Sequence, residues 1–327
     1  MTEAFSKELL RWYRQHRRDL PWRHTRDPYR IWVSEIMLQQ TRVEAAVPYY
    51  HRFLERFPTL AALAEASEND VLTCWSGLGY YSRARNLQRA ARAIHEFPLT
   101  YDAIRALPGI GDYTAAAVAS IAFGLPHAVL DGNVMRVIAR LTCDPSDIGA
   151  PATRKRMQAT AQEWLDRRHP GEFNQAMMEL GATVCLPRHP QCPLCPVRGH
   201  CAAVQAGRAG KLPVKLRKQT PVQIAGQLLV IEKAGAVLLW QREPESGRMA
   251  DFWELPTPEL VPFSGAQRVG SFRHTITHHH YTFEVLRASV RRTPKGFKWI
   301  NPVQLTKVPL STTARKALRI AGIVLEL

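Results

Sequence analysis

The sequence lacks both a long hydrophobic run and a recognisable export signal. No window approaches about 18 consecutive apolar residues, the length that a membrane-spanning helix needs. The first residues, MTEAFSKELL, contain neither a long apolar segment nor a small-residue cleavage site. These absences exclude a membrane-spanning protein and disfavour secretion, so we expect a soluble protein of the cytoplasm.

Acidic residues are also scarce. The chain has 28 Asp and Glu against 44 Lys and Arg, which gives a formal net charge of +16. This balance favours a polyanionic partner, and nucleic acid before a membrane surface. At 327 residues, with 46% hydrophobic residues, the chain is long enough for two domains with real cores.

Cysteine is rare, and its distribution is uneven. Four of the six cysteines fall within 17 residues that also hold four prolines. Without a secretory signal these thiols are expected to be reduced, so a tight cluster indicates a metal site rather than disulfides. The spacing alone fits either a structural zinc ion or an iron–sulfur cluster. The four candidate ligands are Cys185, Cys192, Cys195 and Cys201.

Strand-like alternation is absent before residue 220, so the first part of the chain is predicted to be all-α. Residues 207–221 hold five basic residues, two prolines and no acidic residue, which is typical of a linker. Alternating segments on both sides of Gly235 predict a hairpin, 281–290 predicts a further strand, and a helix is expected over 311–321. We therefore expect an all-α domain over 1–206 and an α+β domain over 222–327.

The all-α part contains a glycine turn between two predicted helices. Pro108-Gly109-Ile110-Gly111 separates a helical pattern that starts at Tyr101 from an alanine-rich helix that ends near Phe123. Such a helix-hairpin-helix, over 101–123, presents free N–H groups that suit a DNA phosphate. The alternative is an ordinary αα-hairpin in a helical core.

Two carboxylates stand in contrasting settings. Glu35 lies among apolar residues of a helix that starts at Asp27-Pro28, and desolvation there would raise its pKa so that it could act as an acid. The alternative is a solvated glutamate on the outer edge of that helix. Asp131 precedes a helix that it is expected to cap, where free amides favour the ionised form. A pair of this kind can protonate a departing base and stabilise an oxocarbenium-like sugar.

Several motifs together resemble the MutY-type adenine DNA glycosylases, of the helix-hairpin-helix superfamily that includes endonuclease III. The resemblance is dense over about 1–205 and loose over 222–327. The matching runs are LPWR (20–23), DPYRIWVSEIMLQQTRV (27–43), GLGYYSRARNL (77–87), LPGIGDYTAAA (107–117), LDGNVMRV (130–137), FNQAMMELGATVC (173–185) and the cysteine quartet.

The resemblance implies a role for individual residues. Glu35 is implied as the acid that protonates adenine, and Asp131 as the group that stabilises the sugar cation or its covalent adduct. Tyr113 stands where lyase relatives carry a nucleophilic lysine, which implies a monofunctional glycosylase, and Asn133 is implied to hydrogen-bond in the catalytic pocket. The cysteine quartet is implied to bind a [4Fe-4S] cluster. Residues implied to contact the flipped base or the DNA are Arg18, Trp22, Arg23, Leu38, Gln40, Thr41, Leu78, Tyr80, Gly109 and Gly111.

The second domain resembles the family's Nudix-like module, which recognises 8-oxoguanine. The family's Phe-Ser-His triplet stands here as Ile276-Thr277-His278, so Thr277 keeps a hydroxyl while the aromatic ring is lost. Adjacent residues of a strand point to opposite faces, so at most two of His278, His279 and His280 could share a metal ion.

The implied function is base-excision repair, by a cytoplasmic enzyme that is associated with the nucleoid. A monomeric enzyme would act on double-stranded DNA that contains 8-oxoguanine:adenine or guanine:adenine, flip the adenine out of the stack and hydrolyse its N-glycosidic bond. Two alternatives stay open. The same scaffold serves glycosylases for other mismatched bases, such as thymine opposite guanine. An iron–sulfur protein that binds DNA without catalysis is the other.

Overall fold

The computed structural model describes residues 3–216, 220–243, 249–276, 278–305 and 308–323. The chain divides into two compact units. The first comprises Met1–Leu54, Thr59–Ala61 and Arg89–Lys218; the second comprises Glu55–Pro58, Ala62–Gln88 and Gln219–Leu327. Compactness does not test independent folding, so the domain limits expected from the sequence stay a prediction. No helix in the described ranges has the length and apolar character needed to cross a bilayer.

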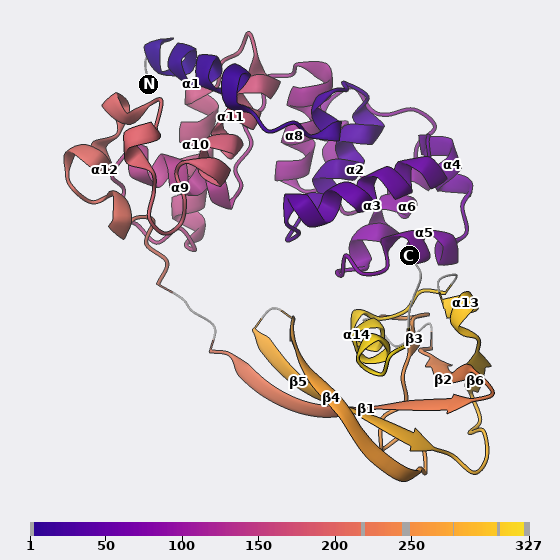
Figure 1. Ribbon diagram of the computed structural model, residues 1–327. Coiled ribbons are helices and arrows are strands. Elements are labelled where there is room, and N and C mark those ends of the chain that lie inside the picture. The colour runs from indigo at the N-terminus through magenta and orange to yellow at the C-terminus, as the bar shows by residue number, and fades with distance from the viewer. Residues whose placement is uncertain (1–2, 217–219, 244–248, 277, 306–307, 324–327) are drawn as a thin grey trace. The chain divides into compact units, whose positions relative to one another are not determined.

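Helices build the first unit (Figure 1). Their bounds are α1 (Glu3–His16), η1 (Pro21–Arg23), α2 (Pro28–Leu38), α3 (Val43–Arg56), α7 (Tyr101–Arg105), α8 (Asp112–Phe123), α9 (Gly132–Leu141), α10 (Pro151–Trp164), α11 (Pro170–Thr183), η2 (Cys192–Leu194), η3 (Arg198–His200), α12 (Ala202–Gln205) and η4 (Ala209–Lys211). The last residues of α3 belong to the second unit. No strand precedes Val222 in the described part of the chain, as the sequence predicts.

The core of the first unit is contributed by α1, α8, α9, α10 and α11. Phe5 and Tyr13 of α1, Val137 of α9 and Phe173 of α11 belong to one buried apolar cluster. Gly171 sets how closely α11 approaches α8, because a Cβ there would lie 2.7 Å from the carbonyl oxygen of Ser120. Tight packing of this kind fixes α11 against α8.

The second unit combines most of α4 (Leu60–Glu65), α5 (Glu68–Trp75) and most of α6 (Ser82–Arg92) with a sheet and two further helices. The strands are β1 (Val222–Lys233), β2 (Ala236–Gln241), β3 (Trp253–Glu254), β4 (Ser264–Ile276), β5 (His279–Ser289) and β6 (Phe297–Ile300). The helices are α13 (Pro302–Leu305) and α14 (Thr312–Ile320). The expected α+β class is confirmed.

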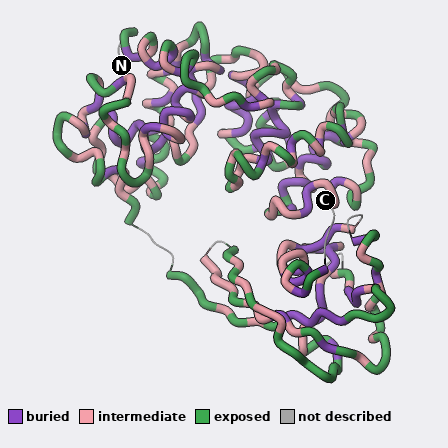
Figure 2. Tube along the Cα trace, in the orientation of Figure 1, coloured by how far each residue is buried: buried purple, intermediate pink, exposed green. Residues whose placement is uncertain are grey.

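The sheet has the order β3-β2-β1-β5-β4, with β6 paired to β2. β1 runs parallel to β5 and antiparallel to β2, and Lys233 pairs with Ala236 across the hairpin predicted at Gly235. Figure 2 shows buried residues in β1 and β2, whereas every residue of β4 is exposed or half-buried. The sequence analysis did not expect β4.

Candidate active site

A cavity of about 650 Å³ opens in the first unit between α2, α8, α9 and α11. This volume lies in the range of small-molecule and nucleotide sites. Ten residues that the sequence analysis proposed for catalysis or base binding line it together, although they come from distant parts of the chain. They are Arg18, Trp22, Arg23, Glu35, Leu38, Gln40, Thr41, Tyr113, Asp131 and Asn133.

Glu35 lies on the buried face of α2. The Asp27 side chain accepts a hydrogen bond from the Tyr29 amide and Pro28 follows it, which starts the helix as predicted. Glu35 is 5% exposed, so the alternative of a solvated glutamate is wrong. The Tyr113 hydroxyl donates to Glu35 Oε2 at 2.8 Å. Burial raises the pKa of Glu35 to about 7, although the Tyr113 hydrogen bond opposes the shift.

Asp131 caps α9, as predicted. Its carboxylate accepts hydrogen bonds from the Val134 amide at 2.7 Å and from Asn133 Nδ2 at 2.8 Å. Burial raises the pKa of Asp131 above its ordinary value, against these hydrogen bonds. The cap therefore does not by itself determine the ionisation of this group. The donors around Asp131 stabilise its anion, and that negative charge adds to the raised pKa of Glu35.

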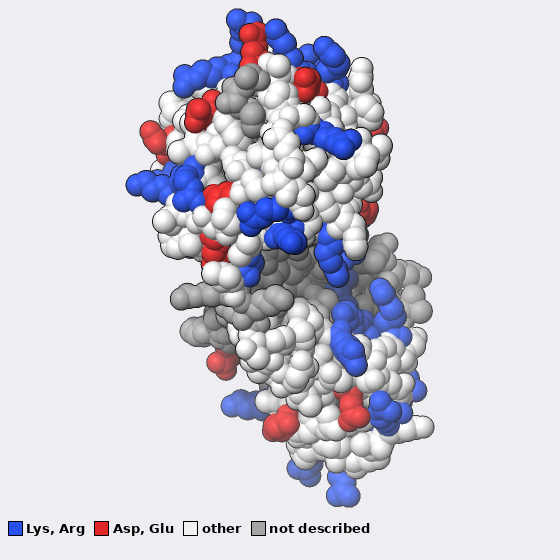
Figure 3. Space-filling view, turned by 90° about the vertical axis from the view of Figure 1, so that its left-hand side faces the viewer, with Lys and Arg blue, Asp and Glu red and all other residues white. Residues whose placement is uncertain are grey.

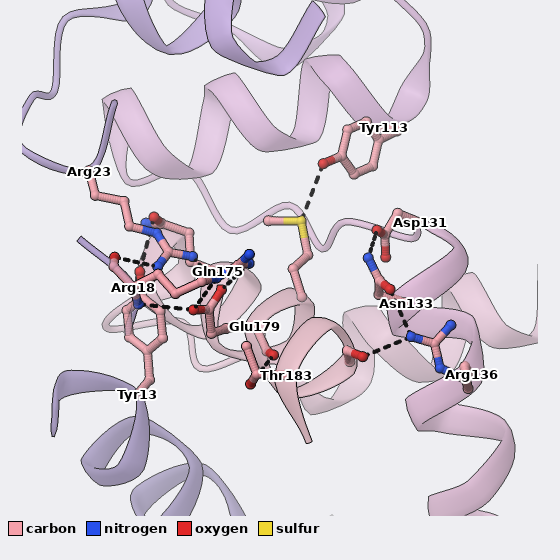
Figure 4. Close-up of polar contacts among 12 residues, drawn as sticks. Tyr13, Arg18, Arg23, Tyr113, Asp131, Asn133, Arg136, Gln175, Glu179 and Thr183 are labelled. Carbon is pink, nitrogen blue, oxygen red and sulfur yellow. Dashed lines mark hydrogen bonds and ion pairs between the residues drawn. The ribbon is translucent and has the colours of Figure 1, made fainter. Parts of the chain in front are cut away.

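The side chain of Asn133 is held by a hydrogen bond from Arg136 (Figure 4). Arg136 Nη2 donates to Asn133 Oδ1 at 2.8 Å and to the Gly181 carbonyl at 2.8 Å, and Arg136 Nε donates to the Cys185 carbonyl at 2.7 Å. A Cβ on Gly181 would lie 2.6 Å from the Asn133 Cβ, so glycine allows α11 to approach this residue closely. The chain thus links Asp131, through Asn133 and Arg136, to the first cysteine of the quartet.

Glu179 was missed by the sequence analysis. It is 1% exposed, lines the cavity and joins two predicted pocket residues: Arg18 Nη2 lies 2.8 Å and Arg23 Nη2 2.7 Å from its Oε2 (Figure 4). Burial would raise the pKa of Glu179, but hydrogen bonds from both guanidinium groups lower it to about 2. The one acidic residue in the otherwise apolar run AMMELGA was the available signal, because a buried charge needs partners.

The helix-hairpin-helix has the predicted helices, α7 and α8. Gly109 has a φ of +76°, a conformation that favours glycine, whereas Gly111 is extended with a φ of −97°. Both are exposed where α8 begins. Gly109 therefore has a turn conformation that only glycine adopts readily, and Gly111 does not.

The two tyrosines of the GLGYY turn have different environments. Tyr80 is 40% exposed and has a φ of +48°, whereas Tyr81 is buried, with its ring 4.0 Å from that of Phe252. Leu78 is half-buried in the same turn. Arg83 donates to the Leu78 and Gly79 carbonyls and so holds the turn from within.

The histidine-rich hairpin is only partly described. Thr277 lies outside the described residues. Ile276 ends β4 and is 38% exposed, and the ring of His278 lies 4.1 Å from that of His279. His278 precedes β5. The expectation that adjacent residues of a strand point to opposite faces therefore applies to His279 and His280, and not to His278.

The four cysteines line one small cavity beside α9 and α11. Arg140 Nη1 lies 3.2 Å from Cys185 Sγ and also donates to the Leu186 carbonyl, so the loop is held to α9. In the described ranges, no three His, Cys, Asp or Glu side chains form a group that could hold a metal ion.

Comparison with known proteins identifies the family of this chain. Residues 33–167 match the family model of the HhH-GPD superfamily base excision DNA repair proteins. The adenine DNA glycosylase of Mus musculus is 34% identical, over 97% of this chain and 77% of that protein, and that of Homo sapiens is 34% identical over 97% and 74%. The solved structure of a thermostable thymine-DNA glycosylase, 29% identical, superposes with a TM-score of 0.56 over 62% of this chain and 96% of that one.

The fold, the cavity and the relatives lead to one conclusion. The helical domain is that of the helix-hairpin-helix repair enzymes, and the curated relatives extend over nearly the whole chain at more than 30% identity. The chain belongs to the adenine DNA glycosylases of base-excision repair.

Proposed function

We propose that this enzyme removes adenine opposite 8-oxoguanine or guanine, as a monomeric, monofunctional glycosylase. The observation that carries the proposal is the pairing of Glu35 and Asp131 in one cavity, with different hydrogen-bond donors around them. Hydrolysis of an N-glycosidic bond needs a proton for the departing base and a negative charge near the sugar. The cavity offers both.

Glu35 is proposed as the acid. A carboxyl with a pKa of about 7 is largely protonated below neutral pH and can still give up its proton to adenine as the bond breaks. Tyr113 keeps the carboxyl oriented through its hydroxyl. Asp131, held by an amide and by Asn133, is proposed to face the positive charge that develops on the sugar.

The described residues that line the cavity support a monofunctional enzyme. Tyr113 occupies the position at which a lyase would carry its lysine, and no lysine is among the described residues that line the cavity. A Schiff base therefore has no nucleophile there. We expect an intact strand with an abasic site as the product.

The DNA is proposed to lie against exposed residues that the resemblance implies in DNA binding. Gly109 and Gly111 precede the free amides of α8, which suit a phosphate. Gln40 and Tyr80 are exposed and have φ values of +57° and +48°, a costly conformation for residues other than glycine and one that concentrates at functional sites. Figure 3 shows Lys and Arg side chains spread over one face with fewer Asp and Glu, as expected for a chain with a net charge of +16.

Cys185, Cys192, Cys195 and Cys201 are proposed to hold a [4Fe-4S] cluster. Support comes from the four thiols, which line one small cavity. When bound, the cluster would stiffen the loop by cross-linking it. Arg140 and Arg136 already connect this loop to α9, so loss of the loop structure would loosen the helix that carries Asn133.

The α+β part of the chain is proposed to recognise 8-oxoguanine through the segment of sequence that includes Thr277 and His278. Ile276 replaces the aromatic residue of the family triplet, so stacking on the lesion would be weaker. We expect a smaller preference for 8-oxoguanine over guanine than an aromatic residue would give.

The proposal is tested with a duplex that holds one 8-oxoguanine:adenine pair. We expect a nick at the adenine only after alkali. Nicking without alkali would contradict the monofunctional mechanism, and tight binding without an abasic product would favour a non-catalytic DNA-binding protein. A guanine:thymine duplex in the same assay tests the other mismatch glycosylases, and thymine release as fast as adenine release would overturn the assignment of adenine.

A further inference from the structure

One methionine lies beside the proposed acid. Met178, on α11, is half-buried and lines the cavity. Its Sδ lies 3.2 Å from the Tyr113 hydroxyl, which donates to Glu35 Oε2 at 2.8 Å. Figure 4 draws this contact as a dashed line from Tyr113 to a sulfur atom. The excision step makes no use of the sulfur.

Accessibility and position together distinguish Met178 from the other described methionines. Met37, Met135, Met157 and Met177 are at most 6% exposed. Met249 is half-buried in the other unit and does not line the cavity. Among the described methionines, Met178 and Met249 are therefore the two that a small oxidant reaches, and only Met178 lies next to catalytic groups.

We propose that Met178 is an oxidation site through which hydrogen peroxide lowers the activity of the enzyme. In this step the sulfur lone pair attacks one peroxide oxygen, an S–O bond forms and the O–O bond breaks. The sulfur is oxidised by two electrons, and the other oxygen takes up the hydroxyl proton and leaves as water. Methionine sulfoxide reductases reverse the change.

The contact with Tyr113 explains why a single oxygen atom matters. A thioether sulfur is a weak acceptor, so the one hydroxyl proton of Tyr113 goes to Glu35. A sulfoxide oxygen is a strong acceptor and competes for that proton. Glu35 then loses a hydrogen bond that orients it, and a polar oxygen enters the space proposed for adenine.

This inference rests on the proposed function of the cavity, and its test separates the two. The full-length protein is treated with hydrogen peroxide, oxidation of each methionine is followed by peptide mass spectrometry, and single-turnover excision is measured on the 8-oxoguanine:adenine duplex. We expect the rate to fall at least about tenfold as Met178 becomes fully oxidised, since proper placement of a general acid is worth more than that. Treatment with both sulfoxide reductases restores the rate.

Two leucine variants serve as a matched pair. Met178→Leu cannot form the sulfoxide, so we expect it to keep its own untreated rate in peroxide. Met249→Leu has the same change in the other unit and is expected to lose activity as the natural protein does.

Three results would overturn the proposal: equal fractional loss in Met178→Leu and the natural protein, a fall in rate while Met178 stays unmodified, or a complete Met178 sulfoxide with an unchanged rate. Absence of adenine release from the untreated protein would instead refute the proposed function. Mass spectrometry reports the reactivity of Met178 in either case.

Discussion

Glu35 and Glu179 lie in the same cavity and are almost equally buried, yet their environments shift their pKa values in opposite directions. Glu35 has a single hydroxyl donor, and burial raises its pKa to about 7. Glu179 binds two guanidinium groups, and its pKa falls to about 2. The difference shows that burial alone does not make a catalytic acid. The number and charge of the donors decide whether a buried carboxyl keeps its proton.

The largest expected effect follows from removing the proton of Glu35. Glu35→Gln keeps the size of the side chain but has no acidic proton, so we expect single-turnover adenine release to fall about 10²- to 10⁴-fold. Glu163→Gln, on the exposed side of α10, is the matched control and should leave the rate unchanged. If Glu35→Gln retained the natural rate, Glu35 would not be the catalytic acid.

Glu179→Gln tests whether the ion pairs of Glu179 stabilise the folded protein. We expect a loss of about 2–4 kcal/mol in the free energy of unfolding at neutral pH, because Arg23 is left buried without its carboxylate while Arg18 stays partly solvated. A group with a lowered pKa contributes stability above its unfolded pKa and loses it as the pH falls. The natural protein should therefore lose this increment between about pH 4.5 and about pH 2, and the variant should not. Urea unfolding over this range measures the difference, and equal stability at neutral pH would contradict the ion-pair account.

Tyr113→Phe sharpens the comparison by removing the hydroxyl that donates to Glu35. The hydrogen bond from Tyr113 lowers the pKa of Glu35 against the effect of burial, so its loss should raise that pKa. We expect the alkaline limb of the rate profile to move up by about one pH unit, the equivalent of one hydrogen bond to a charged group. An unmoved limb would show that Tyr113 does not tune the acid.

The smallest expected effect belongs to a tyrosine on the Glu179 side. The Tyr13 hydroxyl donates to Gln175 Oε1 at 3.1 Å and makes no hydrogen bond to either glutamate. Tyr13→Phe should cost about 0.5–1.5 kcal/mol of stability and leave the pH profile in place. A shifted profile would mean that the two sides of the cavity are coupled.

The sequence identified best those residues whose structural role depends on their immediate neighbours in the chain. Asp131 could be recognised as a cap because the apolar periodicity of its helix starts directly after it, and the structure confirms the cap. The burial of Glu35 remained open in the sequence, since one helix face can point inward or outward. The structure decides it through the packing of α2 against α8, which brings Tyr113 to the carboxyl.

The features that sequence reasoning missed depend on distant partners. Glu179 needs Arg18 and Arg23, which lie more than 150 residues away in the chain. β4 contains two glycines and several polar residues, so its own propensity for a strand is weak, and it forms by pairing with β5.

The central claim is that Glu35 is held protonated near neutral pH and delivers that proton to adenine. The most direct test is the single-turnover rate of the natural protein on an 8-oxoguanine:adenine duplex, from about pH 5 to about pH 9. The account predicts a rate that falls tenfold per pH unit above an apparent pKa near 7, and no such limb in Glu35→Gln. A rate that stays flat to the alkaline end of this range would contradict the claim.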